Sequence, residues 1–343
     1  VYVNGTEVKA HHCGYTAFFV EIAKYLKYGE DNVLAVRVDS RENLNIPPFG
    51  YAIDYMTFGG MYREVYVQVR NKTHLADVFV KPQIHPLQVT TEITVQNISD
   101  GITLQQEIRK KGEGAYSPLG KKPVKQTNVQ TVFPVQEIRL WEPENPYLYE
   151  IRTSLWKNGE MIDARVDITG FREAGFRKDG FYLNGKKLRL RGLNRHQSYP
   201  YVGYAAPASM QIFDADILKK ELGVNAVRTS HYPQSQDFIR RCDEIGLLVF
   251  TEFPGWQHIG DEEWKRQAVQ NLREMIVQYR NHPSIILWGV RINESQDDDV
   301  FYRETNRVAH ELDDTRATGG VRMLKKSHLP VSYTHLRAHE TKA

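Results

Sequence analysis

The sequence feature that most constrains the fold is a change of pattern near Gly175, where alternating β-type runs give way to strand–helix units. Short apolar runs predict strands over residues 188–193, 225–229, 247–251 and 284–292. Between the last two, the segment from Glu262 to Arg280 predicts a helix with Asp261 as its N-cap. Repeated units of this kind imply a parallel sheet covered by helices, either doubly wound or closed into a (β/α) barrel.

The predicted helix carries an apolar stripe at helical spacing, which we expect to be core rather than a binding surface. Its members are Trp264, Ala268, Leu272, Met275, Ile276 and Tyr279.

Polar side chains follow each predicted strand. They are Asn194 and His196 after the first strand, Arg228, Ser230 and His231 after the second, Glu252 after the third, and Asn293 with Glu294 after the fourth. In a (β/α)8 TIM barrel, the carboxyl ends of the strands converge on one face, where the active site is built. This favours the barrel over the doubly wound fold. No glycine-rich phosphate-binding motif follows a strand, so no nucleotide cofactor is expected.

Two β-rich regions precede the barrel-like region. Residues 1–81 contain alternating runs at 32–38 and 64–69 and predict an antiparallel sandwich that lacks its first strands. Residues 82–174 predict strands near 89–96, 129–134 and 149–156, and their length suits an immunoglobulin-like sandwich that acts as a spacer. Hairpin turns are expected at three Asn-Gly pairs, beginning at Asn4, Asn158 and Asn184.

Composition argues against several classes of protein. The 343 residues include 45 Lys and Arg against 42 Asp and Glu, for a net charge of +3, and the lysine pairs are scattered, so no nucleic-acid partner is expected. No run of about 18 apolar residues occurs, so no membrane span is expected. Cys13 and Cys242 cannot build a disulfide framework or a zinc site, and we expect free thiols.

Both ends of the chain look incomplete. Residues 1–6 open directly in a strand-and-turn pattern rather than a signal peptide, so the compartment, cytoplasmic or periplasmic in a bacterium, cannot be assigned. Residues 330–343 continue neither strand nor helix, and they resemble a translated sequencing adapter of the kind found at the ends of metagenomic reading frames. We expect genuine sequence to stop near Leu329 and residues 330–343 to be a non-native tail.

Glu294 is the candidate for acid catalysis. A buried strand would hold it in a partly dry pocket, the setting in which a carboxyl group keeps its proton near neutrality. Glycoside hydrolysis uses such a group together with a second carboxylate. Asn293 beside it could donate to a sugar hydroxyl or to the nucleophile. The alternative is that Glu294 only caps the next helix, with nearby acidic residues in its first turn.

Three other strand-end residues are equally open to two interpretations. Arg228 and His231 could clamp sugar oxygens or position a carboxylate, but they could also form a structural salt bridge. His196 could contact the sugar or be a satisfied structural histidine.

Several ordered segments resemble the signatures of glycoside hydrolase family 2, which includes β-galactosidases, β-glucuronidases and β-mannosidases. The segments in the barrel-like region are Arg191–His196, Val227–Pro233, Cys242–Leu247 and Asn281–Ser295. Upstream, Asp54–Arg63 resembles a loop of the family's N-terminal jelly-roll domain, while Leu140–Pro143 and Gly170–Arg172 resemble the borders of its immunoglobulin-like domain. The resemblance spans roughly residues 1–325.

The resemblance implies a role for each matching residue. Glu294 would be the acid/base, Asn293 and Arg228 would be polar pocket residues, His196 and His231 would contact or orient the sugar, and Asp54 would reach in from the jelly roll. The resemblance also implies three domains. Residues 1–81 would form the jelly roll, residues 82–174 the immunoglobulin-like sandwich, and residues 175–329 the first part of a TIM barrel.

Two departures from the family pattern stand out. Where some β-galactosidases have a magnesium-ligating Glu after the third strand, this chain has Trp256, which puts that metal site in doubt and suits stacking on a sugar face. The family's nucleophile is a Glu after the seventh strand, and this chain reaches only the fourth or fifth.

The function that the resemblance implies is a retaining β-glycosidase acting on an oligosaccharide or other β-glycoside, most simply a β-galactosidase, without a cofactor. The fragment itself is expected to be inactive, and a homo-oligomer is left open for the full-length parent. β-Glucuronidase and β-mannosidase are alternatives within the family. One rival from another class is a non-catalytic carbohydrate-binding protein. Another is a barrel enzyme of different chemistry, such as an aldolase, but an aldolase requires a Lys or a metal cluster at the strand ends.

Overall fold

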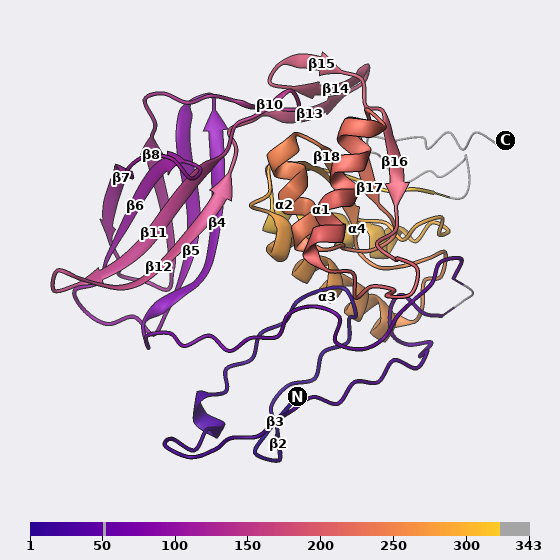
Figure 1. Cartoon of the computed structure of the whole chain (residues 1–343), viewed down its shortest axis with the longest axis horizontal. Coiled ribbons are helices and arrows are strands. Elements are labelled where there is room, and N and C mark those ends of the chain that lie inside the picture. Colours follow the sequence, from indigo (N-terminus) through magenta and orange to yellow (C-terminus); the bar gives the residue numbers. More distant parts are fainter. Residues whose placement is uncertain (51–52, 323–343) are drawn as a thin grey trace.

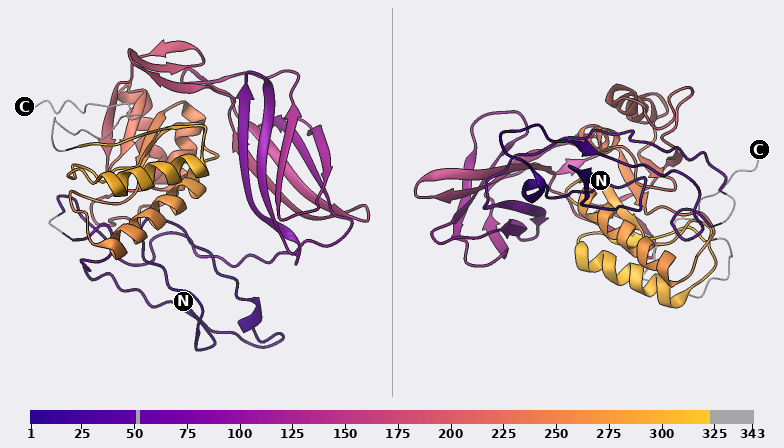
Figure 2. Two further views of the ribbon diagram at one scale, coloured as in Figure 1. Left: turned by 180° about the vertical axis from the view of Figure 1, so that it is seen from behind. Right: turned by 90° about the horizontal axis from the view of Figure 1, so that it is seen from below.

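The computed structural model describes residues 1–50 and 53–322, which form three regions (Figure 1). A β-sandwich and an α/β region lie beside each other, and the N-terminal region, indigo in Figure 1, runs along one side of both. Figure 2 shows the same arrangement from behind and from below. The tail predicted over residues 330–343 lies outside the described residues.

The sandwich consists of two antiparallel sheets, one in the order β12-β11-β6-β7 and the other in the order β4-β5-β8. The strands are β4 (His74–Ile84), β5 (Leu87–Gln96), β6 (Thr103–Lys110), β7 (Ser117–Pro123), β8 (Asn128–Pro134), β11 (Tyr149–Lys157) and β12 (Glu160–Thr169). Inward-facing residues such as Val89, Ile93 and Ile151 form a shared core. The strands predicted over 89–96, 129–134 and 149–156 are confirmed, and β4 runs across the boundary expected between residues 81 and 82.

The three predicted Asn-Gly hairpins are also confirmed. Asn4, Asn158 and Asn184 have φ values of 49°, 52° and 50°, and the glycine after each has a φ of 83°, 83° and 76°. Two consecutive residues with positive φ are what a tight type I′ turn requires, and Asn-Gly supplies them at the least steric cost.

Short antiparallel elements join the sandwich to the α/β region. They are β9 (Trp141–Glu142), β10 (Asn145–Pro146), β13 (Ala174–Arg177), β14 (Gly180–Leu183) and β15 (Lys186–Leu188). Trp141 is fully buried, and its indole nitrogen donates to the Asp243 carbonyl at 2.8 Å. This contact ties the end of the sandwich to the α/β region.

The α/β region contains five parallel strands in sequential order: β16 (Gly192–Arg195), β17 (Ala226–Thr229), β18 (Leu248–Glu252), β19 (Ile285–Gly289) and β20 (Ala317–Gly319). A doubly wound sheet would reverse its strand order, so the sequential order identifies part of a TIM barrel. The first strand starts later than the predicted 188–193, because Lys186–Leu188 pairs with β14 in the preceding hairpin.

Helices alternate with these strands and share a core with them. They are α1 (Ala208–Asp216), continued by a π-helical turn at Ile217–Glu221, then α2 (Gln236–Ile245), α3 (Glu262–Tyr279) and α4 (Asp299–Leu312). Val227, Val249 and Ile285 point toward the helices, whereas Leu248 and Phe250 face Phe181 and Leu183 of the connecting hairpin. None of the helices in the described part of the chain is long and apolar enough to cross a bilayer.

Helix α3 forms as predicted. The Asp261 carboxylate accepts from the Trp264 amide at 2.9 Å, which caps the first turn. All six residues of the predicted apolar stripe are buried.

Truncating this stripe gives a stability prediction. Met275→Ala should lower the free energy of unfolding of the α/β region by about 2–5 kcal/mol, since it leaves a cavity in a closely packed core. Val277→Ala, on the exposed side of the same helix, is the matched control. The measurement is the urea midpoint of the helical circular dichroism signal, and equal midpoints for the two variants would contradict the prediction.

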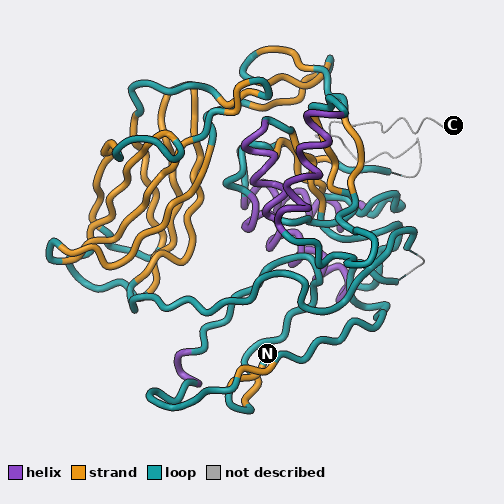
Figure 3. Tube along the Cα trace, viewed as in Figure 1, coloured by secondary structure: helices purple, strands orange, loops and turns teal. Residues whose placement is uncertain are grey.

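The N-terminal region contains little regular structure and is mostly loop (Figure 3). Its elements are β1 (Tyr2–Val3), β2 (Thr6–Glu7), the 3₁₀ turn Ala23–Tyr25 and β3 (Leu34–Ala35). Strands predicted over 32–38 and 64–69 are wrong except at 34–35, because no neighbouring strand in the described residues pairs with them. The apolar side chains of the second run therefore stay exposed, with Val69 at 95%.

A loop of this region nevertheless packs on the α/β region. The Trp264 indole donates to the Phe49 carbonyl at 2.9 Å, and the Tyr204 hydroxyl donates to the Met56 carbonyl at 2.8 Å. Arg63 donates to the Tyr204 carbonyl at 2.6 Å and to Gln197 Oε1 at 2.9 Å. Phe49, Met56 and Arg63 are thereby held at the carboxyl ends of the parallel strands.

Candidate active site

A buried ion pair lies at the carboxyl ends of β17 and β18. Arg228 donates to Glu252 Oε1 at 2.7 Å, and the two side chains are only 10% and 1% exposed. Gly289 makes room for this pair, because a Cβ at that position would stand 2.2 Å from the Glu252 Cβ. The pair fixes the position of the guanidinium group at the strand ends.

Two further site residues are oriented by this pair. His231 Nδ1 lies 2.9 Å from Glu252 Oε1 and 3.0 Å from Arg228 Nη2, and the tautomer with its proton on Nδ1 is the one that donates to the carboxylate. Arg228 Nη2 donates to Asn293 Oδ1 at 2.7 Å. Asn293 therefore turns its amide Nδ2 away, and this buried donor finds no hydrogen-bond partner within the described residues.

Glu252 remains ionised in this setting. Burial by itself would raise the pKa of Glu252, but the Arg228 charge and the hydrogen bond from His231 outweigh burial and lower that pKa below its usual value. Glu252 is thus a permanent negative charge that holds the two neighbouring side chains.

His196 lies at the end of β16, where its ring packs among aromatic side chains. Its centroid is 5.3 Å from that of Tyr55 and 5.4 Å from that of His231, and its Nδ1 lies 3.1 Å from the Tyr232 hydroxyl. That hydroxyl accepts from the Gln197 amide at 3.3 Å, which leaves its own proton for His196 Nδ1. Neutral His196 then carries its proton on Nε2 and can donate from there.

The pKa of His196 gives a prediction for titration. Desolvation by neighbouring side chains, reinforced by the charges of His231 and Arg228, lowers this pKa to about 4. Its nuclear magnetic resonance (NMR) signals, assigned with His196→Gln, should titrate near pH 4. Because the unfolded state binds this proton at higher pH, the stability that the group contributes should be lost as pH falls from about 6.5 toward 4. A midpoint near 6.5 in the folded protein would contradict this environment.

An aromatic wall stands beside these polar groups. Trp256, in the loop after β18, has its ring centroid 4.8 Å from that of His231. Tyr55, from the N-terminal loop, contacts the rings of His196, His231, Tyr232 and Trp256. Asp54 directly precedes Tyr55 in the chain and is exposed.

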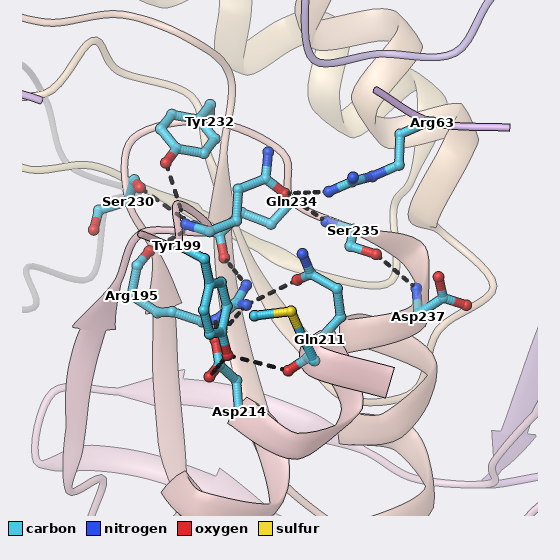
Figure 4. A network of polar contacts seen from close by, with 12 residues as sticks. Arg63, Arg195, Tyr199, Gln211, Asp214, Ser230, Tyr232, Gln234, Ser235 and Asp237 are labelled. Atoms are coloured by element: carbon cyan, nitrogen blue, oxygen red, sulfur yellow. Dashed lines mark hydrogen bonds and ion pairs between the residues drawn. The ribbon is translucent and has the colours of Figure 1, made fainter. Parts of the chain in front are cut away.

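A polar network that includes Tyr232 lies at the ends of β16 and β17 (Figure 4). Buried Arg195 donates to Asp214 at 2.8 Å, to Gln211 at 2.8 Å and to Gln234 at 2.7 Å. Gln234 also donates to the carbonyls of Arg195 and Ser230, at 2.5 Å and 3.3 Å. These contacts hold the ends of β16 and β17 against α1 and the loop that precedes α2.

Glu294 lies after β19 on a backbone that is held on both sides. Its amide donates to the Val321 carbonyl at 3.0 Å, and the preceding Asn293 carbonyl accepts from the Gln257 amide at 2.8 Å. The interpretation of Glu294 as a helix cap is wrong, because Asp298 caps α4 by accepting from the Phe301 amide at 3.0 Å. Glu294 Oε2 instead accepts from Gln257 Nε2 at 3.2 Å.

The structure joins most of the predicted site residues through contacts. Arg228, His231 and Asn293 share one network with Glu252. The rings of His196 and Trp256 pack against His231, and Glu294 follows Asn293 in the chain. The sequence interpretation did not assign Tyr55 or Gln257. Each lies next in the chain to a residue that it did assign, which is the only signal that could have found them.

The loop after β18 contains Trp256 where some family members are expected to have a metal-ligating Glu. The indole of Trp256 offers no lone pair to a metal ion. Within residues 1–50 and 53–322, no group of three or more His, Cys, Asp and Glu side chains could hold a metal.

A β-sandwich followed by a partial TIM barrel with a carboxylate at its strand ends is the arrangement expected of a multidomain glycoside hydrolase. The family model "Glycosyl hydrolases family 2" matches residues 73–172, and "Glycosyl hydrolases family 2, TIM barrel domain" matches residues 175–331. The chain belongs to glycoside hydrolase family 2.

Curated relatives and solved structures are similar over almost the whole chain. A β-galactosidase from Thermoanaerobacter pseudethanolicus is 50% identical, covering 95% of this chain and 45% of its own. A β-glucuronidase from Bacteroides fragilis is 32% identical over 93% of this chain and 49% of its own. The structure of Bacteroides uniformis β-glucuronidase 2, covalently bound to cyclophellitol-6-carboxylate aziridine, superposes with a TM-score of 0.82 at 30% identity, covering 93% of this chain and 42% of that one. The chain therefore spans about half the length of the relatives it matches.

Proposed function

We propose that this chain is part of a retaining β-glycosidase in which Glu294 is the acid/base. The observation that carries the proposal is the placement of its carboxyl group on a backbone held from both sides, directly after Asn293. In the first step Glu294 gives its proton to the glycosidic oxygen, and in the second it takes a proton from water.

Neighbouring groups have roles that follow from their contacts. Arg228 fixes the Asn293 side chain so that Nδ2 can donate to a sugar hydroxyl or to the nucleophile. Trp256 offers an aromatic face to the sugar, and His196 and His231 orient hydroxyl groups. Asp54 would accept from a hydroxyl at the outer end of the pocket.

We further propose that the nucleophile is a Glu beyond this chain, about 5 Å from Glu294 in the complete barrel. The described residues contain five parallel strands, whereas roughly eight close such a barrel. The 343-residue chain alone should accordingly show no sustained turnover of an aryl β-glycoside. Robust turnover by the purified chain would overturn this part of the proposal.

The substrate that we favour is a β-galactoside. The β-galactosidase from Thermoanaerobacter pseudethanolicus shares 50% identity with this chain, against 32% for the β-glucuronidase from Bacteroides fragilis. A glucuronide would need a cation for its carboxylate, and Arg228 is already neutralised by Glu252. The test compares aryl β-galactoside, β-glucuronide and β-mannoside in the chain extended to the length of its relatives. Preference for the glucuronide or mannoside would overturn the choice of sugar but leave the glycosidase intact.

The rival function is carbohydrate binding without catalysis. Measurable sugar affinity in residues 1–170 alone, with no activity in the extended chain, would favour the rival.

A further inference from the structure

Gln257 lies in the loop after β18, on a backbone bound to that of the acid/base. Its amide donates to the Asn293 carbonyl at 2.8 Å, and residues 256 and 293 form an isolated parallel bridge. Gln257 and Glu294 both have positive φ, 55° and 52°. Non-glycine residues rarely adopt this conformation, and it persists where surrounding contacts impose it, often at functional sites.

The two side chains meet above this paired backbone. Gln257 Nε2 donates to Glu294 Oε2 at 3.2 Å. We propose, on the basis of the function proposed above, that Gln257 is a positioning residue that selects which oxygen of Glu294 carries the catalytic proton. In a protonated carboxyl group the carbonyl oxygen is a better acceptor than the hydroxyl oxygen, so a donor held at Oε2 favours the form in which Oε2 is the carbonyl oxygen and the proton is on Oε1.

The hydrogen bond also changes in strength during the reaction. In the first step the Oε1–H bond breaks and the proton goes to the leaving oxygen. The bond of that oxygen to the anomeric carbon breaks with its electron pair moving to oxygen, and the nucleophile bonds to the carbon. Glu294 is then a carboxylate, and a hydrogen bond to a charged acceptor is stronger than one to a neutral group. Gln257 thus assists proton transfer as well as orientation.

The experiment uses the chain extended to the length of its relatives and compares Gln257→Met with Gln270→Met. Gln270 makes the same kind of bond, from Nε2 to Glu274 Oε1 at 3.0 Å, on the exposed side of α3. Gln257→Met should lower kcat/KM about ten- to a hundredfold for a β-galactoside with a poor leaving group, as expected for losing one hydrogen bond to a charged group. It should change kcat/KM for a dinitrophenyl galactoside, which needs no proton, by less than about threefold.

The pH profile separates this role from a structural one. Gln257→Met removes a hydrogen-bond donor to the ionised Glu294, so the alkaline limb of kcat/KM should move to higher pH. Gln257→Glu places a second carboxyl group beside Glu294 and should move that limb further. Gln270→Met should not move it. Equal losses on both substrates with an unmoved limb would overturn the proposal.

A second measurement needs no turnover and uses the 343-residue chain. The NMR signals of the Gln257 side-chain amide should shift with pH in the natural chain and not in Glu294→Gln. An amide that is insensitive to pH would overturn the pairing. If Glu294→Gln leaves the extended enzyme active on poor leaving groups, the proposed function fails. If it abolishes that activity while Gln257→Met does not, only the role of Gln257 fails.

Discussion

Glu294→Gln should lower kcat/KM for β-galactosides with poor leaving groups about 10²- to 10⁴-fold in the extended chain, the usual contribution of a positioned general acid. The glutamine keeps the shape of the side chain and the contact of its oxygen with Gln257 but has no acidic proton to give. A dinitrophenyl galactoside leaves without protonation, so its kcat/KM should fall far less. The ratio of the two losses is therefore the quantity to measure.

A nucleophile that needs no base completes this test. Azide should restore turnover of the dinitrophenyl substrate in Glu294→Gln, because it attacks the glycosyl-enzyme intermediate without deprotonation, and the product should be the β-galactosyl azide. Equal loss on both substrates with no azide rescue would contradict the acid/base role.

Glu252→Gln should destabilise the α/β region by about 3–5 kcal/mol, because it leaves the Arg228 charge buried without its counter-charge. The double variant Arg228→Met, Glu252→Leu removes both charges and should recover much of that loss. Glu304→Gln breaks an exposed pair with Arg307 on α4 and should leave the urea midpoint unchanged. A single variant as stable as the natural chain would contradict the buried pair.

The same pair sets an acid limit on stability. Since the folded-state pKa of Glu252 is lowered, its stabilising contribution is complete above its unfolded pKa, near 4.3, and is lost as pH falls through the lower folded value. The natural chain should lose stability over that window more steeply than Glu252→Gln does.

Much of the scaffold could be predicted from local sequence alone. The stripe on α3 and the cap at Asp261 were predictable because helical spacing and capping chemistry act within a few residues. The Asn-Gly turns are equally local. The strand prediction over 64–69 was wrong because alternating apolar and polar residues form a strand only beside a partner strand. The sequence of residues 64–69 does not show whether such a partner strand is present.

The candidate site was only partly predictable. Strand-end positions identified Arg228, His231 and Asn293, which the barrel topology brings together. That Gln257 contacts Glu294, or that Tyr55 packs on His231, depends on loops whose paths are set by tertiary contacts 37 and 176 residues apart. No pattern within either loop encodes such a pairing.

The anchoring of Phe49, Met56 and Arg63 on the α/β region bears on how members of this family could be recombined. Exchanging the catalytic half for that of a relative would cut the bonds of Trp264 and Tyr204 to the N-terminal loop and replace the surface on which Tyr55 rests. Crossover points placed between the two regions would therefore yield chimaeras in which Tyr55 and its aromatic partners come from different parents. Inheriting both segments from one parent would keep the contacts of Tyr55 with His196, His231 and Trp256.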